Sequence, residues 1–292
     1  MPGPIDVFAA LGAAVGEGPV WDPRTDTFVS VDILGALVFG HSEDGTLVSS
    51  TAVGDHVGAA LPSSSPGLLL AMRAGWTYLN ADQLLEPLSL PVADDPTVRF
   101  NDASCDPLGR AFGGTMAYDE APGRGSLYRL DPGLASRQVV ACVTLSNGLG
   151  WSPDGKTLYF IDSGAQTIAA YPYEVEEHKL GVPRTLVSFE PREGMPDGLT
   201  VDESGAVWVA LFGGGQIRRY SPAGVLDRAV DLPVSQPTSL ALGGRDGRML
   251  VITTARHNLT DAQLEAEPHA GDIFAMECST PGQPTPLWED LR

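Results

Sequence analysis

Four oxygen-bearing side chains occupy one position of a repeated sequence pattern. Each lies six residues before the anchor of a turn that is rich in Pro, Gly or acidic residues: Glu17, Asn101, Asn147 and Asp197. Two further repeats carry Ala60 and Ser239 at this position. Two carboxylates and two amide oxygens, without thiolate or imidazole, are the ligands that a hard divalent cation such as Ca²⁺, Mg²⁺ or Mn²⁺ prefers.

This ligand set leaves room for chemistry at the cation. If each side chain supplies one oxygen, four of the roughly six to eight positions around Ca²⁺ are filled, and at least two remain for water or substrate. The structural alternative is that Asn and Asp before Gly simply start turns. That alternative explains Asn147 or Asp197 taken singly. It does not explain Glu17, because Glu is a poor turn residue, nor does it explain four residues in one register.

Other polar residues carry weaker signals. Asp32 and Asp162 share a second repeat position, where they either support the site from behind or cap strand ends through backbone hydrogen bonds. The five histidines fall at different repeat positions, and the chain has no G-x-S-x-G motif, so a Ser-His-Asp hydrolase is disfavoured. We expect the histidines on the surface or in loops, with His56 and His257 as the two that a loop could bring to a channel mouth.

The elements that must position these side chains are short strands. Runs of β-branched and aromatic residues alternate with Gly- and Pro-rich turns along the chain. The turns are anchored at Pro23, Pro66, Pro107, Pro153, Glu203 and Arg245. Their intervals of 41–50 residues are the period of one four-stranded propeller blade. Six turns predict an all-β fold, a six-bladed β-propeller formed by residues 1–292 as a single domain.

Propeller geometry explains why one repeat position matters. The innermost strand of each blade lines the central channel, so residues at one repeat position converge at one height on the axis. The pattern therefore predicts a metal site in the channel. Residues 5–10 are expected to pair with the last blade and close the ring, and residues 260–267 to form one short helical turn.

Composition limits the partners. The 292 residues include 18 Lys and Arg against 37 Asp and Glu, a net charge of −19, which repels nucleic acid and anionic membrane surfaces. The chain has no apolar run of membrane-span length and no basic segment before an apolar one at the start, so we expect a cytoplasmic protein. Three cysteines, Cys105, Cys142 and Cys278, fit neither a disulfide framework nor a zinc ribbon and are expected to be buried.

The motifs resemble those of one known family. In chain order they are Gly16-Glu17-Gly18-Pro19-Val20-Trp21, Arg99-Phe100-Asn101-Asp102, Gly114-Thr115-Met116, Asn147-Gly148-Leu149, Ser152-Pro153-Asp154-Gly155 and Pro196-Asp197-Gly198. They are collinear over nearly the whole chain, which resembles the regucalcin, gluconolactonase and luciferin-regenerating enzyme family, also called the senescence marker protein family. The resemblance implies a six-bladed propeller that carries one divalent cation on its axis and hydrolyses sugar lactones and related esters.

The resemblance also implies roles for single residues. Glu17, Asn147 and Asp197 match the family's metal ligands, and Asn101 matches a residue that borders the metal and contacts substrate. Whether Asn101 also binds the metal directly stays open. Arg99 and Asp119 match substrate-contacting positions, and Asp119 stands where some members have Glu, so its side chain is shorter. The expected cofactor is one divalent cation, Ca²⁺ in the first place, with Zn²⁺, Mn²⁺ or Mg²⁺ as alternatives.

The residues support an enzyme with a small-molecule substrate, which the resemblance implies to be a lactone. Arg99 lies two residues before Asn101, so both side chains of an extended segment project to the same side, and a guanidinium there could bind a hydroxyl-rich or anionic substrate. In the expected reaction the metal polarises the lactone carbonyl and Asp197 activates water.

Two other functions remain open at this stage. One is a non-catalytic, metal-stabilised propeller that binds a protein partner, and the other is a phosphotriesterase-type hydrolase. A broad apolar face would favour the partner-binding protein, whereas an open ion in a pocket with few polar groups would favour the enzyme. The sequence leaves the oligomeric state, the particular lactone and the closing loops undecided.

Overall fold

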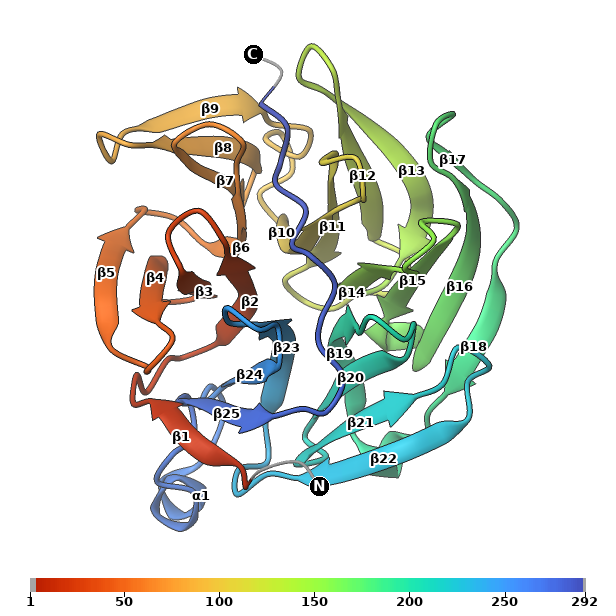
Figure 1. The fold of residues 1–292 in the computed structure, drawn as a ribbon. Coiled ribbons are helices and arrows are strands. Elements are labelled where there is room, and N and C mark those ends of the chain that lie inside the picture. Colours follow the sequence, from red (N-terminus) through yellow and green to blue (C-terminus); the bar gives the residue numbers. More distant parts are fainter. Residues whose placement is uncertain (1–3, 291–292) are drawn as a thin grey trace.

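The computed structural model describes residues 4–290, which form six antiparallel β-sheets arranged in a ring around one axis (Figure 1). This arrangement confirms the expected six-bladed β-propeller. In each blade the strands follow one another from the axis to the rim, so consecutive strands pair as neighbours. The innermost strands are β2, β6, β10, β14, β19 and β23.

Blade 1 is the first blade whose four strands follow one another in the sequence. Blade 1 contains β2 (Gly16–Asp22), β3 (Thr27–Asp32), β4 (Leu37–Ser42) and β5 (Leu47–Ala52). Blade 2 contains β6 (Val57–Pro62), β7 (Gly67–Met72), β8 (Gly75–Asn80) and β9 (Leu85–Ser89). Blade 3 contains β10 (Val98–Cys105), β11 (Ala111–Ala117), β12 (Gly125–Asp131) and β13 (Ala135–Val143).

The remaining blades show two departures from the simple pattern. Blade 4 contains β14 (Ser146–Trp151), β15 (Thr157–Asp162), β16 (Thr167–Glu174), β17 (Lys179–Leu180) and β18 (Arg184–Ser188), with β17 and β18 both paired to β16. Blade 5 contains β19 (Met195–Val201), β20 (Val207–Phe212), β21 (Gln216–Tyr220) and β22 (Leu226–Asp231). Blade 6 contains β23 (Pro237–Gly243), β24 (Met249–Thr254), β25 (Ile273–Glu277) and β1 (Asp6–Ala9). Short 3-10 turns cover Ser163–Ala165 and Pro191–Glu193.

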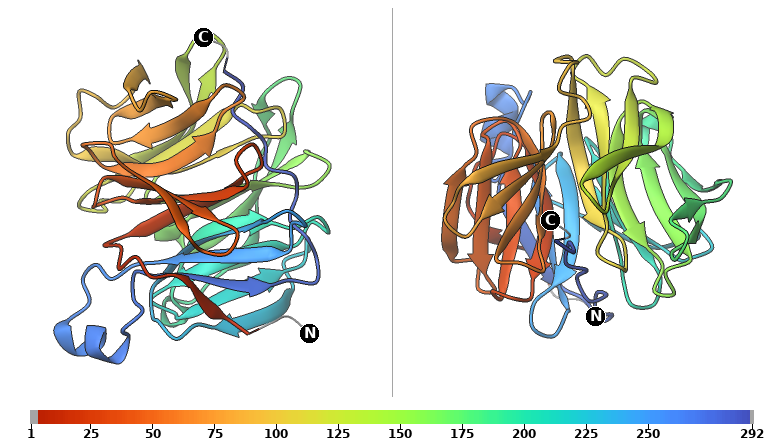
Figure 2. Two further views of the ribbon diagram at one scale, coloured as in Figure 1. Left: turned by 60° about the vertical axis from the view of Figure 1, so that its left-hand side comes forward. Right: turned by 90° about the horizontal axis from the view of Figure 1, so that it is seen from above.

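The ring closes through the amino-terminal strand. β1 pairs antiparallel with β25 and forms the outermost strand of blade 6, as the sequence predicted. The helical turn is also confirmed as α1 (Asp261–Ala266), which stands out from the ring (Figure 2). Its N-cap is Thr260, whose side chain accepts a hydrogen bond from the Gln263 backbone N. The Gln263 side chain in turn accepts one from the Thr260 backbone N, and the two bonds form a capping box. Among residues 4–290, no helix has the length and apolar character needed to cross a membrane.

The core lies between neighbouring blades. Trp76 of β8 packs edge to face against Phe100 of β10, with ring centroids 5.2 Å apart, and joins blade 2 to blade 3. Phe112 of β11 packs in the same way against Trp151 of β14, at 5.3 Å, and joins blade 3 to blade 4. Cys105 and Cys278 are buried as expected, but Cys142 is exposed because it lies at a kink of the rim strand β13, with a positive φ of 60°.

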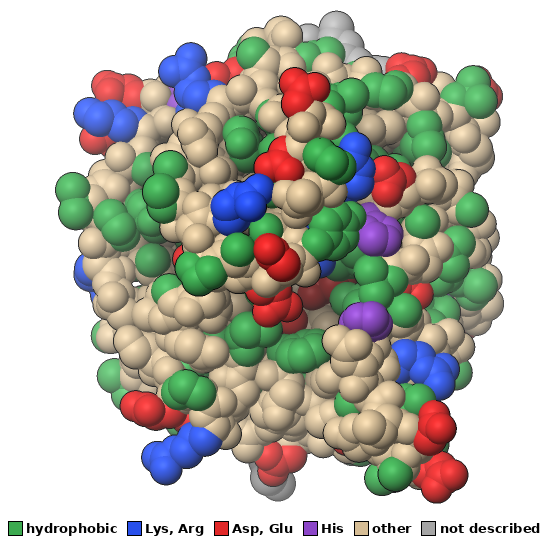
Figure 3. Space-filling model, turned by 180° about the vertical axis from the view of Figure 1, so that it is seen from behind, with side chains coloured by type: hydrophobic (Ala, Val, Ile, Leu, Met, Phe, Trp, Pro, Cys, Tyr) green, Lys and Arg blue, Asp and Glu red, His purple; other side chains and the backbone are tan. Residues whose placement is uncertain are grey.

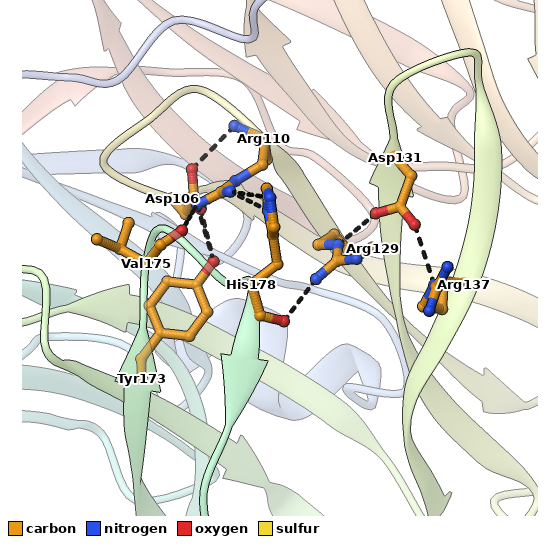
Figure 4. A network of polar contacts seen from close by, with 8 residues as sticks. All are labelled: Asp106, Arg110, Arg129, Asp131, Arg137, Tyr173, Val175 and His178. Atoms are coloured by element: carbon orange, nitrogen blue, oxygen red, sulfur yellow. Dashed lines mark hydrogen bonds and ion pairs between the residues drawn. The ribbon is translucent and has the colours of Figure 1, made fainter.

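A polar network reinforces the contact between blades 3 and 4 (Figure 4). The fully buried Asp106 carboxylate accepts hydrogen bonds from Arg110 Nε and from the Tyr173 hydroxyl, both at 2.7 Å. Arg110 also contacts the His178 ring and donates to Val175 O, and Arg129 donates to His178 O. The β16–β17 hairpin is therefore held against blade 3 by charged hydrogen bonds.

The carboxy-terminal segment, residues 279–290, crosses one face of the ring over the channel (Figure 1). We call this segment the strap. Gln283 Nε2 donates to Trp151 O at 2.8 Å and to Val201 O at 3.2 Å, at the ends of two innermost strands. Trp288 is buried and pairs with Ser63 through a parallel bridge. The strap thus ties blades 2, 4 and 5 together on one face.

The equivalent aspartates Asp32 and Asp162 serve as caps. Asp32 accepts hydrogen bonds from the backbone of Ala14, Val15 and Gly35 at 2.9–3.1 Å. Asp162 accepts from the corresponding residues of blade 4 at 3.1 Å: Thr144, Leu145 and Gly164. Of the two interpretations left open by the sequence, the structure therefore supports the capping of strand ends.

Glycines let the innermost strands approach one another. A Cβ on Gly58 would lie 1.7 Å from Asn101 O of the next blade. A Cβ on Gly148 would lie 2.6 Å from Leu199 N and 2.9 Å from Asp197 O. Any larger side chain at these two positions would push neighbouring blades apart and widen the ring at the height of the candidate site.

This packing gives a prediction for Gly148→Ala. The added methyl group overlaps backbone atoms, so we expect the free energy of unfolding to fall by about 3 kcal/mol, as for an overpacked core. Urea denaturation measures the change. The control is Gly133→Ala, where φ is +79° but no atom lies within 4 Å of the new Cβ, so only the backbone term of about 1 kcal/mol applies. Equal losses in the two variants would contradict the packing argument.

Candidate metal and substrate site

The candidate residues lie at the channel end opposite the strap. Figure 3 shows this face, which is hollowed near its centre, with acidic side chains in the hollow and histidine side chains at its edge. Glu17, Asn101, Asn147 and Asp197 are all buried, between 3% and 7% exposed. They come from four different blades and lie near the starts of their strands, whereas the strap contacts strand ends.

Strand irregularities aim these side chains. In β10, β14 and β19 two residues face a single residue of the next strand: Asn101 with Asp102, Asn147 with Gly148, and Asp197 with Gly198. In β2 the two residues follow directly after Glu17. Such bulges break the alternation of a strand and re-aim the side chains beside them. In four blades the side chain at this repeat position is therefore aimed by a bulge rather than by the regular alternation of the strand.

Blades 2 and 6 do not follow the turn spacing. Their irregularities fall at Gly58 and Thr238 rather than at Ala60 and Ser239. The anchor Pro66 directly precedes β7, whereas three residues separate every other anchor from the next strand, and β23 continues for five residues after its irregularity against three in β19. Neither Gly58 nor Thr238 offers a carboxylate, and Thr238 Oγ1 donates to Gly16 O at 2.5 Å, so blades 2 and 6 contribute nothing to the acidic group, which comes from blades 1, 3 and 5.

The two amides are held by a chain of hydrogen bonds. Asn101 Nδ2 donates to Asn147 Oδ1 at 2.6 Å and to Ser146 O at 2.9 Å. Asn147 Nδ2 donates to Ser163 Oγ at 2.8 Å, and Ser163 Oγ donates to Pro196 O at 2.5 Å. This chain links blades 3, 4 and 5 and fixes Asn147 with its oxygen toward Asn101.

The two carboxylates lack compensating donors. Glu17 accepts one hydrogen bond, from Gly18 N at 2.9 Å, and no donor among residues 4–290 forms a hydrogen bond with the Asp197 carboxylate. Burial raises the pKa of Glu17 well above its usual value, and repulsion from Asp197 and Asp102 raises it further. Burial and repulsion from Asp102 raise the pKa of Asp197 in the same way. The pair is therefore unfavourable in its ionised form without a cation.

Asp102 is a third buried carboxylate, which the sequence analysis treated only as part of a motif. Its burial raises its pKa to about 7, opposed only by a hydrogen bond from Ala103 N at 2.7 Å. It also borders a cavity of about 500 Å³ that is lined by the innermost strands and by residues of the strap, including Gln283. Its position directly after Asn101 was the one sequence signal that could have identified it.

Arg99 is the cation nearest to this acidic group. Its NH1 donates to Asn101 Oδ1 at 2.6 Å and to Phe100 O at 3.0 Å. Burial lowers its pKa, while the charges of Tyr118, Glu17, Asp197 and Glu120 act in the opposite direction. The structure therefore brings Arg99 together with Asn101, Glu17 and Asp197, as the sequence analysis expected.

Asp119 is placed differently from the other candidates. It is exposed, and its carboxylate accepts a hydrogen bond from Ala121 N at 3.1 Å within its own loop. The neighbouring Glu120, with a positive φ of 54°, interacts electrostatically with Arg99 instead. His56 does reach the site, because its Nδ1 bonds to the Tyr118 hydroxyl at 2.7 Å beside Arg99. His257 is exposed in the loop after β24.

The donor set fits a divalent cation. Among residues 4–290, His, Cys, Asp and Glu side chains form no group of three or more arranged to hold a metal ion; the candidate set instead pairs two carboxylates with amide oxygens. The two enclosed carboxylates, Glu17 and Asp197, repel each other and together accept a single hydrogen bond. A hard cation would neutralise them.

Comparisons with known proteins agree with this geometry. Residues 15–256 match the family described as SMP-30/Gluconolactonase/LRE-like region. A Bacillus subtilis (strain 168) protein provisionally named sugar lactone lactonase YvrE is 34% identical over 282 residues, covering 96% of this chain and 97% of the relative. Xenopus laevis regucalcin is 35% identical over 269 residues, covering 90% of each chain.

Solved structures are similar over the same length. A luciferin-regenerating enzyme superposes with a TM-score of 0.92 at 30% identity, covering 99% of this chain and all of the other. A calcium-binding regucalcin from Agrobacterium tumefaciens superposes with a TM-score of 0.93 at 26% identity, covering 98% and 97%. The similarity therefore extends over the whole ring in both sequence and fold.

The uncompensated carboxylates predict how the metal-free protein behaves. Because the folded-state pKa of Glu17 and of Asp197 lies above the unfolded value, protonation favours the fold, and chelated protein loses stability as pH rises above about 4. Glu17→Gln should raise the melting temperature of chelated protein at pH 8. Mn²⁺ at about a hundredfold excess over its Kd should stabilise the wild type by about 3 kcal/mol and the variant by much less.

The matched control is Glu174→Gln, which neutralises an exposed glutamate of β16. It should leave both the chelated melting temperature and the Mn²⁺ response of the wild type unchanged. Thermal unfolding with and without chelator measures all three proteins. A Glu17→Gln protein that responds to Mn²⁺ like the wild type would show that Glu17 does not bind the cation.

Proposed function

The chain belongs to the SMP-30/gluconolactonase/LRE-like family, and from this premise we propose that it is a divalent-metal-dependent lactonase that opens sugar lactones. The observation that carries the proposal is the pair of buried carboxylates, Glu17 and Asp197, which have almost no hydrogen-bond donors and lie beside Asn147 and Arg99. The relative named for sugar lactone lactonase activity supports lactones as the substrate class.

The residues that would hold the cation are Glu17, Asn147 and Asp197, with Asn101 beside them. Ca²⁺ is the preferred ion, in keeping with the calcium-binding regucalcin, and Zn²⁺, Mn²⁺ or Mg²⁺ are the alternatives. Once bound, such an ion supplies Lewis-acid polarisation of the lactone carbonyl. Asn101 donates to Asn147 Oδ1, so it keeps that side chain in one orientation whether or not it binds the ion itself.

Arg99 and Asn101 orient the substrate. Arg99 NH1 is engaged with Phe100 O and Asn101 Oδ1, so its other nitrogens are available to ring and exocyclic oxygens of a lactone. A guanidinium held by two hydrogen bonds loses little further freedom when substrate binds. Asp119 is the third residue proposed to contact substrate, from the loop that follows β11.

Asp197 is the proposed general base. Its carboxylate accepts no hydrogen bond from residues 4–290, so its lone pairs remain available to a water molecule. The water oxygen attacks the carbonyl carbon while its proton passes to Asp197. When the bond between the acyl carbon and the ring oxygen breaks, that proton is returned to the ring oxygen, and the product is a hydroxy acid.

Removal of the metal or of its ligands should abolish turnover. Chelated protein should lose hydrolysis of D-glucono-1,5-lactone and regain it with Ca²⁺, Mn²⁺ or Zn²⁺. Asp197→Ala and Glu17→Ala should each lower kcat/KM by a factor of about 100 or more, the range for loss of one electrostatic contributor to an acyl-transfer site. Circular dichroism of each variant serves as the folding control. Full activity of either variant would reject the assignment.

A second test separates Asp119 from Glu120. If Asp119 contacts substrate, Asp119→Asn should raise KM for D-glucono-1,5-lactone about tenfold, the effect of one lost charged hydrogen bond. Glu120→Gln, which removes the carboxylate that interacts with Arg99, should change KM less. Steady-state kinetics of the two single variants decide. A larger effect of Glu120→Gln would transfer the substrate role to that residue.

A further inference from the structure

Four hydrogen-bonding side chains form one wall beside the candidate site, on the side of blades 2 and 3. They are His56 directly before β6, Arg73 in the β7–β8 turn, Arg99 in β10, and Tyr118 directly after β11. We call them the donor wall. Three of them, His56, Arg73 and Tyr118, belong neither to the motifs of the sequence nor to the residues assigned a role above.

Tyr118 is the centre of the donor wall. Its hydroxyl bonds to His56 Nδ1 at 2.7 Å, and the two rings lie 5.6 Å apart. The Arg99 guanidinium carbon lies 5.9 Å from the Tyr118 ring centroid. The Tyr118 backbone N donates to Thr97 O at 2.9 Å. Although it is fixed by these contacts, Tyr118 is 42% exposed, so it presents a held aromatic face and hydroxyl at the site.

Arg73 is tied to the same wall through its backbone. Its N donates to His56 O at 2.8 Å, and its carbonyl accepts from Phe100 N at 3.1 Å, next to Arg99. Its Nε lies 3.3 Å from Asp55 Oδ2. Its NH1 atom is buried and has no hydrogen-bond partner among residues 4–290. A buried guanidinium N–H without an acceptor is costly. The Arg73 side chain is 25% exposed, so its guanidinium can turn toward a bound ligand, whose oxygen would then accept from this N–H.

Burial and neighbouring charges determine the protonation state of His56, and hence which member of the His56–Tyr118 pair donates the hydrogen bond. The pKa of His56 is lowered, first by its burial and then by the charge of Arg99, with Arg73 adding to the effect against Asp55. His56 is therefore neutral at pH 7, and its Nδ1 can accept the Tyr118 proton. The Tyr118 oxygen is then left as an acceptor, while Arg73 and Arg99 supply donors, so the wall matches hydroxyl groups, which both donate and accept.

We propose, resting on the lactonase function above, that Arg73 and Tyr118 form a subsite beside Arg99 for the exocyclic hydroxyl groups of a sugar lactone. His56 is the positioning residue that orients Tyr118. This subsite sets the preference for hydroxylated lactones over lactones that carry no hydroxyl group, because a lactone without hydroxyl groups leaves the Arg73 NH1 without a partner.

The test compares two six-membered lactones, D-glucono-1,5-lactone and δ-valerolactone, with protein loaded with Mn²⁺. In Arg73→Gln the ratio of kcat/KM for gluconolactone to kcat/KM for valerolactone should fall at least about tenfold, through a higher KM for the gluconolactone and with a smaller change in valerolactone turnover. Tyr118→Phe, which keeps the ring over Arg99, should lower the ratio about threefold. Arg124→Gln is the control, because Arg124 is exposed and pairs with Asp95 instead.

Binding of the non-hydrolysable D-glucono-1,5-lactam, measured by calorimetry, gives a readout without turnover. Arg73→Gln should weaken it about tenfold and Arg124→Gln should not. If Arg73→Gln fails to fold, Arg73→Lys takes its place, because it keeps the charge but not the planar donors, and the same direction of change is expected.

The possible failures are distinguishable. If the wild type opens neither lactone, the proposed function is wrong and the lactam binding alone decides on the subsite. If the wild type opens gluconolactone but Arg73→Gln keeps both the ratio and the lactam affinity, the subsite is wrong and the lactonase function stands.

Discussion

The structure depends on like charges enclosed together on the axis of a ring. Glu17, Asp197 and Asp102 are buried in one place, and Arg99 is the cation nearest to them. Glu17 and Asp197 carry two negative charges when both are ionised, which a single divalent cation balances. Burial of unpaired charge is among the most costly features a fold can carry, and this cost is the main support for the proposal that the site binds a cation.

The ring architecture makes such an enclosure possible. Bulges in the innermost strands turn polar side chains toward the axis, and glycines such as Gly58 and Gly148 let neighbouring strands come close enough to bring them together. β1 closes blade 6 from the rim, and the strap holds strand ends on the opposite face. The strap therefore spans one face of the ring, and the candidate site lies at the other.

The repeat register in the sequence was sufficient for the parts of the site that depend on the blade period. Six turns gave the number of blades, and one repeat position gave Glu17, Asn101, Asn147 and Asp197, all of which are buried at one end of the channel. Where the turns vary, the register slipped, as at Ala60 and Ser239. The position of the bulge determines which side chain faces the axis, and that position depends on strand pairing and not on the distance to a turn.

Features that depend on tertiary contacts could not be predicted. In a regular strand the Asp102 side chain would point to the face opposite that of Asn101. It reaches the acidic group only because the bulge places the two residues side by side. The link between His56 and Tyr118 joins residues 62 positions apart in two blades, and no local spacing encodes it. Asp119 shows the converse, since a motif position alone did not reveal that its carboxylate bonds within its own loop.

The most direct measurement is anomalous X-ray diffraction from crystals soaked in Mn²⁺. We expect one strong peak on the axis, within about 2.5 Å of oxygens from Glu17, Asn147 and Asp197, with at least one coordination position open to solvent. A peak elsewhere, no peak at all, or an ion fully enclosed by protein atoms would contradict it.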